Sequence, residues 1–188
     1  MKRILILLLP LIIWSTSAWS KEYQYEADVK GMVCAFCAYS VGKNINKLPG
    51  IVKESVDVSL KKGEVRFRST SRVTQKTLEP LFTKSGFTIS GLTETEVKTA
   101  SNTSRKATPT LELNFPGTDT DKFEPVIKAI GNIAAAAPSR LVIEAPQSLE
   151  MEILEPLLLG RQQVIKVEFV PVEQKSIRLR FFEEASKD

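Results

Sequence analysis

Residues 23–89 alternate between two hydrophobic periods, and the order in which they do so restricts the fold more than any other feature of the chain. Tyr25 and Ala27 lie in a stretch with the two-residue period of a strand, which stops at Gly31. The later segments are a helical pattern over 38–48, a hairpin over 56–67 that turns at Lys61-Lys62-Gly63, a helical pattern over 74–84 and a strand opened by Phe87 and Ile89. This order, strand, helix, strand, strand, helix, strand, predicts an α+β ferredoxin-like sandwich of one antiparallel sheet and two helices.

The rest of the chain predicts a linker and a second domain. Residues 93–109 contain Val97 as their only large aliphatic side chain and show neither period, so we expect a flexible linker. Residues 110–188 predict a separate small α/β domain whose last two strands form a terminal hairpin. Its expected elements are strands at 111–115, 141–145, 164–170 and 177–181 and helices near 121–136 and 148–159.

The first 20 residues have the pattern of a secretory signal peptide. Lys2-Arg3 precede an almost wholly apolar run from Ile4 to Trp14, and the small residues Ala18 and Ser20 follow it. The run is short and is interrupted by Pro10, so it would span a bilayer poorly. We expect residues 1–20 to be cleaved, the mature chain to be periplasmic and not integral to the membrane, and the first domain to cover 21–92.

Composition excludes several classes of function. The chain has no histidine, which excludes histidine-based general catalysis, Ser-His-Asp sites and zinc sites with histidine ligands. Without Lys2 and Arg3 the 26 basic residues fall to 24 against 22 acidic ones, a balance that argues against a nucleic-acid partner. The sequence has no paired-carboxylate or phosphate-loop pattern, so we expect no enzyme site.

The chemistry-bearing residues are Cys34 and Cys37, the only cysteines of the chain. They lie where the first strand connects to the first helix, and the free backbone N–H groups and the dipole of a helix start lower thiol pKa values, that of Cys37 in particular. Thiolates are the ligands that soft metal ions prefer. Two sulfurs suit Cu(I) or Hg(II), whereas Zn(II) or Cd(II) would need two further ligands.

Three short motifs together resemble a known family. They are Gly31-Met32-x-Cys34-x-x-Cys37, Leu48-Pro49-Gly50-Ile51 and Ser85-Gly86-Phe87. Over residues 23–91 the chain resembles the heavy-metal-associated domain of copper chaperones, copper-transporting ATPases and mercury-binding periplasmic proteins. The resemblance implies that Cys34 and Cys37 are metal ligands, that Met32 supports the loop from inside and that Phe87 packs beside the site.

The resemblance also implies a cargo and a partner. The cargo would be Cu(I) or another thiophilic ion, with Hg(II), Zn(II) and Cd(II) as alternatives. Transfer would proceed by thiolate ligand exchange with a metal-transporting ATPase or another metal-accepting protein.

Alternatives stay open at this point. The cysteines could form a disulfide, or serve a periplasmic thiol–disulfide oxidoreductase, although Val33 and Ala35-Phe36 differ from the residues usual around such pairs. A third possibility is a metal-sensing adaptor that acts through the C-terminal domain.

Phe36 stands where the family usually has a small residue and is expected to shield the metal or to form a docking contact. Pro80 predicts that the second helix bends, or begins late with Thr77 as its cap.

Overall fold

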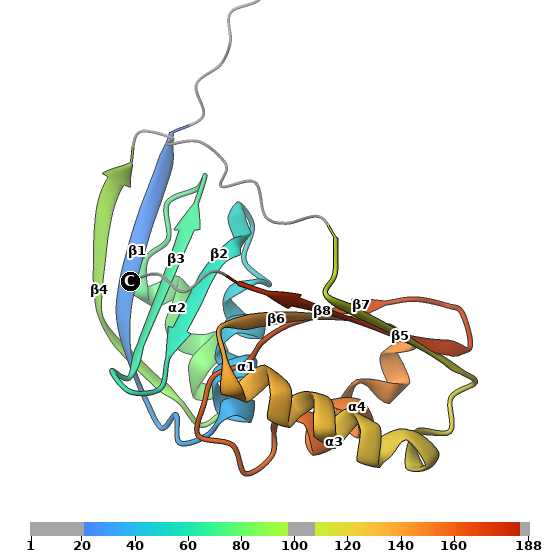
Figure 1. Ribbon diagram of the computed structural model, residues 1–188. Coiled ribbons are helices and arrows are strands. Elements are labelled where there is room, and N and C mark those ends of the chain that lie inside the picture. The colour runs from blue at the N-terminus through green and yellow to red at the C-terminus, as the bar shows by residue number, and fades with distance from the viewer. Residues whose placement is uncertain (1–20, 98–107, 185–188) are drawn as a thin grey trace, which may run out of the picture.

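The computed structural model describes residues 21–97 and 108–184 and shows two four-stranded sheets, each packed against helices (Figure 1). The expected signal peptide, 1–20, lies outside the described residues. The first domain has the predicted element order: β1 (Glu22–Lys30), α1 (Ala35–Ile45), β2 (Ile51–Ser59), β3 (Glu64–Ser69), α2 (Gln75–Thr83) and β4 (Thr88–Val97).

The first sheet has the strand order β2-β3-β1-β4, and all its neighbouring strands are antiparallel. Tyr25, Ala27 and Val29 of β1 are almost completely buried, because the two-residue period places them all on the face that the helices cover. Leu78 and Phe82 of α2 join the same core. The predicted ferredoxin-like sandwich is confirmed.

The start of the expected linker was wrong, because β4 continues to Val97. Its second half pairs with β1 in the register Glu22↔Val97 and Glu26↔Thr93. The sequence showed no apolar period there because this edge strand is held by main-chain pairing and by polar contacts, such as the 2.9 Å hydrogen bond that Tyr25 Oη donates to Glu94. The first domain therefore extends past residue 92, and residues 98–107 of the expected linker lie outside the described part of the chain.

The predicted late start of α2 was also wrong. The helix begins at Gln75, and the N-cap is Thr74, whose hydroxyl accepts a hydrogen bond from the backbone N–H of Thr77 at 3.3 Å. Pro80 lies inside the helix. Leu78 and Phe82 on either side of it are fully buried, so their packing holds the helix despite the hydrogen bond that proline cannot donate.

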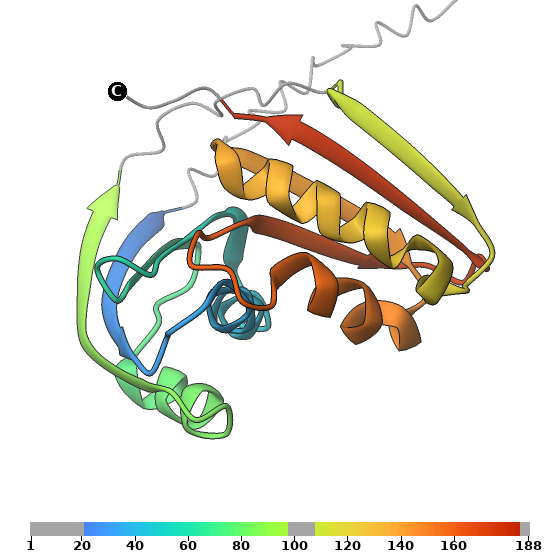
Figure 2. The same ribbon diagram turned by 60° about the horizontal axis from the view of Figure 1, so that its bottom comes forward.

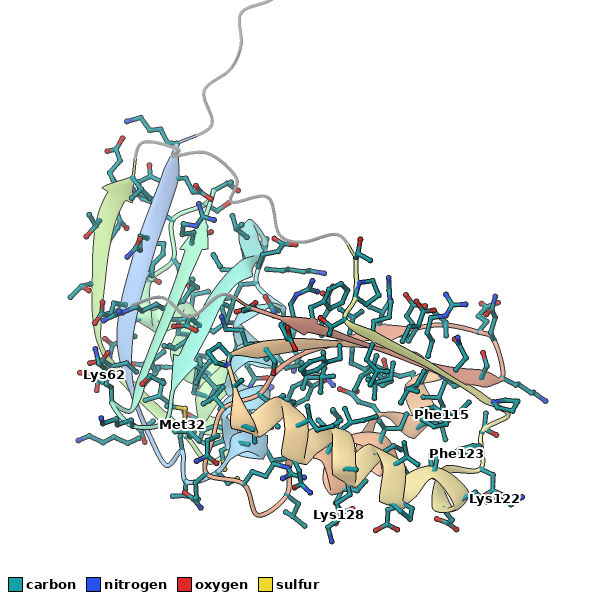
Figure 3. The ribbon with its side chains drawn as sticks, viewed as in Figure 1. Met32, Lys62, Phe115, Lys122, Phe123 and Lys128 are labelled. Carbon is teal, nitrogen blue, oxygen red and sulfur yellow. The ribbon has the colours of Figure 1, made fainter. Side chains whose placement is uncertain are left out.

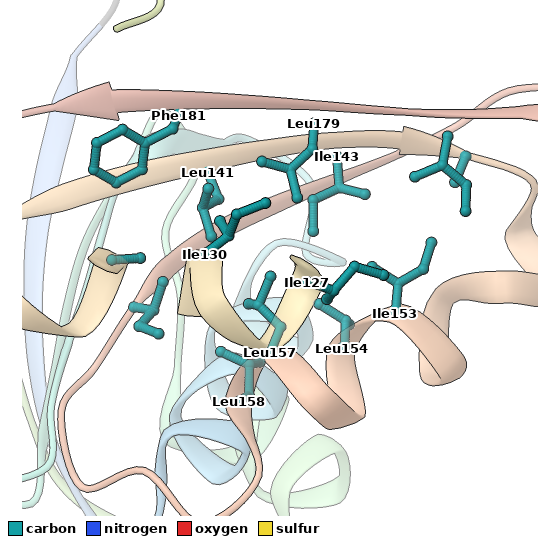
Figure 4. Close-up of a cluster of buried hydrophobic side chains, with 14 of the residues drawn as sticks. Ile127, Ile130, Leu141, Ile143, Ile153, Leu154, Leu157, Leu158, Leu179 and Phe181 are labelled. Atoms are coloured by element: carbon teal, nitrogen blue, oxygen red, sulfur yellow. The ribbon is translucent and has the colours of Figure 1, made fainter. Parts of the chain in front are cut away.

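The second domain contains six longer elements and one short helix. They are β5 (Leu111–Pro116), α3 (Thr120–Ala136), β6 (Ser139–Ala145), the 3₁₀ helix η1 (Gln147–Leu149), α4 (Glu150–Leu158), β7 (Lys166–Pro171) and β8 (Ser176–Glu183). Helices α3 and α4 lie together on one face of this second sheet (Figure 2). Their apolar faces and the sheet enclose the core shown in Figure 4.

The expected terminal hairpin is not formed, because the strand order is β5-β8-β6-β7. Strand β7 pairs in parallel with β6, and β8 lies between β5 and β6, antiparallel to both. Burial explains why β8 is central and β7 lies at the edge of the sheet. Strand β8 needs a central position because its residues Ile177, Leu179 and Phe181 are nearly inaccessible to solvent. Strand β7 suits an edge because it carries the exposed residues Lys166 and Glu168.

The two domains meet at α1, which lies between the first sheet and the second domain in both views (Figures 1 and 2). Ala35, the first residue of α1, is fully buried within the core of the second domain. The second domain is therefore packed against the first one, not separate from it. Within 21–97 and 108–184, no helix has the length and apolarity needed to cross a membrane.

Candidate metal centre

The loop that carries the two cysteines starts at a position that requires glycine. Gly31 follows β1 with a φ of +99°, a conformation that residues with a Cβ rarely adopt. A Cβ at this position would lie 3.3 Å from the carbonyl oxygen of Gly86 and 3.4 Å from Cδ1 of Phe87. The turn therefore packs the loop closely against the segment that precedes β4.

Cys34 and Cys37 lie together at the N-terminus of α1. Cys34 is the N-cap residue, and its Sγ accepts a hydrogen bond from the backbone N–H of Cys37 at 3.3 Å. Both side chains are half-buried free thiols, with their Sγ atoms 2.7 Å apart. Two sulfurs bound to a tetrahedral zinc ion at about 2.3 Å would lie roughly 3.8 Å apart, so metal binding requires the two side chains to rotate away from each other.

The two thiols differ in acidity. Burial raises the pKa of Cys34, and its hydrogen bond with Cys37 raises that pKa further. Burial also opposes ionisation of Cys37, but hydrogen bonds from the Cys34 thiol and from backbone N–H groups at the helix start outweigh it, so the pKa of Cys37 is lowered. The direction predicted for Cys37 is confirmed, and the arrangement favours one thiolate beside one thiol.

The other residues of the loop divide between core and solvent. Met32 and Phe87 are half-buried and pack against the core of the first domain (Figure 3 labels Met32). Their expected roles in supporting the site stay predictions. Val33, next to Cys34, is 71% exposed, so the loop presents an apolar side chain to solvent directly beside the thiols.

The second domain contacts the same helix start. The backbone N–H of Ala35 donates a 2.9 Å hydrogen bond to the carbonyl oxygen of Arg161, which satisfies one of the free donors of the first turn. Phe36 and Tyr39 pack against the core of the second domain, with ring centroids 6.3 Å apart. Of the two roles expected for Phe36, the structure shows a docking contact, and it is made within the chain.

Glu150 fixes the side of α1 that faces the second domain, and the sequence did not indicate this role. It is 5% exposed and accepts hydrogen bonds from Tyr39 Oη at 2.5 Å, Lys43 Nζ at 2.6 Å and Gln147 Nε2 at 2.5 Å. Burial alone would raise the pKa of Glu150, but these donors outweigh it and hold the pKa below its usual range. The signal that could have indicated it is an acidic residue in the first turn of a helix.

Cys34 and Cys37 are the two side chains of the loop whose chemistry suits a soft metal ion. Within residues 21–97 and 108–184, no three Cys, Asp or Glu side chains group closely enough to hold a metal ion. Two sulfurs suit an ion of low coordination number, and an ion that needs four ligands must take the others from solvent or from a partner.

Comparison with known proteins supports the resemblance seen in the motifs. Residues 26–88 match the model of the heavy-metal-associated domain family. One similar solved structure comes from work on crosstalk between Cu(I) and Zn(II) homeostasis, with 22% identity over 36% of this chain and 94% of that chain and a TM-score of 0.32. Another is oxidized MerP from Ralstonia metallidurans CH34, with 23% identity over 37% of this chain and 94% of that chain and a TM-score of 0.33. No curated protein matches the chain.

Proposed function

From the premise that residues 26–88 are a heavy-metal-associated domain, we propose that the chain is an exported carrier of a soft metal ion, Cu(I) foremost, held between Cys34 and Cys37. The observation that carries the proposal is the pair of adjacent free thiols at the start of α1, one of them with a lowered pKa. A thiolate and a neighbouring thiol that loses its proton on binding form the ligand set that a thiophilic ion prefers.

Release would proceed by ligand exchange. Because the site supplies two sulfur ligands and its loop exposes Val33, an incoming thiolate of an acceptor has room to bind before either cysteine leaves. Few bonds then break in each step, so binding is tight while transfer stays fast. The acceptor we propose is a metal-transporting ATPase or another metal-accepting protein of the periplasm, and the chain acts as a carrier without catalytic activity.

A competition titration tests the proposal. The freshly reduced chain is titrated with Cu(I) against a chromophoric chelator, together with the variants Cys34→Ser and Cys37→Ser. We expect one Cu(I) per parent chain and a loss of affinity by several orders of magnitude in each variant, because serine hydroxyls are poor ligands for soft ions. Ser40→Ala, a change of another small polar side chain on α1, serves as the control and should bind as the parent does.

Titrations with Hg(II), Zn(II) and Cd(II) then establish the preference among ions. The two-sulfur site should favour Cu(I) and Hg(II) over Zn(II) and Cd(II). Unchanged Cu(I) affinity in both cysteine variants would contradict the assignment of the site.

A further inference from the structure

A cavity of about 480 Å³ lies between the two domains. It is enclosed by α1 of the first domain, by Val56 and Val58 of β2, and by the segment 164–171 that includes β7. Its volume falls within the range of about 300–1,000 Å³ that is usual for binding sites. Both domains are needed to form it, and neither Cys34 nor Cys37 lines it.

The pattern of lining residues shows that the groove faces the edge of β7. Successive side chains of a strand point to opposite faces, so a groove that covers a face is lined by alternate residues. Strand β2 lines the groove with Val56 and Val58 and, nearer its start, with the consecutive residues Lys53 and Glu54, whereas every residue from Val164 to Pro171 lines the groove. Among the described strands, β7 pairs only with β6, and its other edge therefore presents unpaired main-chain groups to the cavity.

The charged side chains that line the groove balance one another, with four basic residues (Lys43, Lys53, Arg140 and Lys166) and four acidic ones (Glu54, Glu150, Glu168 and Glu184). Lys43 pairs with Glu150, Lys166 with Asp57 at 3.7 Å and Arg140 with the carboxylate of Glu168 at 3.6 Å. A site for a phosphate, a nucleic acid or a lipid headgroup would offer uncompensated cations. Because the charges of the lining balance, the groove instead suits an occupant without net charge.

One polar atom of the lining lacks a partner. Asn46, the C-cap residue of α1, lines the groove, and its Oδ1 is buried without a hydrogen-bond donor among the described residues. A buried acceptor without a donor is costly, and because this oxygen is closed off from solvent it adds to the cost of the fold without being within reach of an occupant. The free strand edge matches the main chain of a peptide, and the apolar side chains of the lining match its side chains.

We propose that the groove binds an extended segment of a partner protein, uncharged and apolar at alternate residues, which adds as a further strand to the free edge of β7. Main-chain hydrogen bonds to the edge would supply affinity, and the apolar lining would select the side chains of the segment. The proposal concerns a second site and does not depend on metal binding at the cysteines.

Selection from a phage-displayed library of random ten-residue peptides on the full chain tests the proposal. We expect enrichment of uncharged sequences with apolar residues at every second position. The best peptide is then synthesised with an N-methyl group at each amide in turn. Because only alternate N–H groups of an added strand face β7, methylation should lower affinity at least tenfold at every second position and have little effect between them. Failure to enrich any peptide, or the same sensitivity at all positions, would overturn the proposal.

A pair of variants places the peptide in the groove. Gly42 lines the cavity, and a Cβ there would make ordinary contacts of 3.8 Å and 3.9 Å with Val56 and Val58, so Gly42→Leu adds a side chain into the groove while favouring the helix. Ala129→Leu introduces the same leucine side chain at an exposed position of α3. We expect Gly42→Leu to lower peptide affinity at least tenfold and leave Cu(I) affinity unchanged, with Ala129→Leu neutral for both. Peptide binding that Gly42→Leu leaves unchanged would contradict the location of the peptide in the groove. A parent chain that fails to bind Cu(I) would contradict the metal site alone.

Discussion

At the scale of single residues, the site depends on the difference between its two thiols. Hydrogen bonds lower the pKa of Cys37 and burial raises that of Cys34, so Cys37 is the first of the two thiols to ionise as the pH rises. We predict that iodoacetamide modifies Cys37 before Cys34, as measured by peptide mass spectrometry over a range of pH values. In Cys34→Ala the thiol that donates to Cys37 is removed, and the pH at which Cys37 reacts should rise. Equal rates for the two thiols in the parent would contradict the asymmetry.

The turn at Gly31 gives a stability prediction at the same scale. Gly31→Ala introduces a Cβ at a positive φ and within 3.4 Å of neighbouring atoms, so the free energy of unfolding should fall by about 1–3 kcal/mol. Gly86→Ala is a matched control, because Gly86 also has a positive φ, of +78°, but a Cβ there meets no atom within 4 Å. Chemical denaturation should show the larger loss of unfolding free energy for Gly31→Ala. Equal losses in the two variants would mean that the close contacts at Gly31 do not contribute to stability.

At the scale of elements, Glu150 connects α4 to α1. Its folded pKa lies below the usual value, so its contribution to the free energy of unfolding is fully present above about pH 5 and is lost as the pH falls through the folded pKa. We predict that Glu150→Gln lowers stability by about 2 kcal/mol at pH 7, since a charge-assisted pair with Lys43 and a bond from Tyr39 are weakened. The difference from the parent should shrink towards pH 3.

The control for this experiment is Glu155→Gln, a change of an exposed carboxylate on the same helix. Thermal or denaturant unfolding at several pH values should give a flat difference for Glu155→Gln and a pH-dependent one for Glu150→Gln. A pH-independent difference for Glu150→Gln would show that its carboxylate does not connect the helices.

At the scale of the whole molecule, local sequence patterns predicted most helices and strands and the position of the two cysteines at the start of a helix. They did not predict how segments distant in the sequence pair and pack. The hydrophobic periods predicted β1 and the presence of α1, because each pattern reflects one face of one element, although the helix begins and ends three residues earlier than the predicted 38–48. The insertion of β8 between β5 and β6 depends on which strand is buried most deeply in the assembled sheet. Phe36 packs against the core of the other domain, and the bonds from Tyr39 and Lys43 to Glu150 join residues more than 100 positions apart, so no local pattern in the sequence indicates these contacts.

The domain boundary was misjudged for a related reason. The second half of β4 is stabilised by main-chain pairing with β1, which leaves no apolar period in the sequence. The consequence at this scale is that the second domain covers the side of α1 next to the metal site, while the exposed Val33 marks the side that stays open. The acceptor proposed above would therefore approach the thiols from the side of Val33.

The most direct measurement of the central claim is X-ray absorption spectroscopy of the full chain loaded with one equivalent of Cu(I). The account predicts that the nearest neighbours of copper are two sulfur atoms, and that these disappear from the spectrum in the double variant Cys34→Ser and Cys37→Ser. A copper ion surrounded only by nitrogen and oxygen in the parent, or a spectrum that the double variant leaves unchanged, would contradict it.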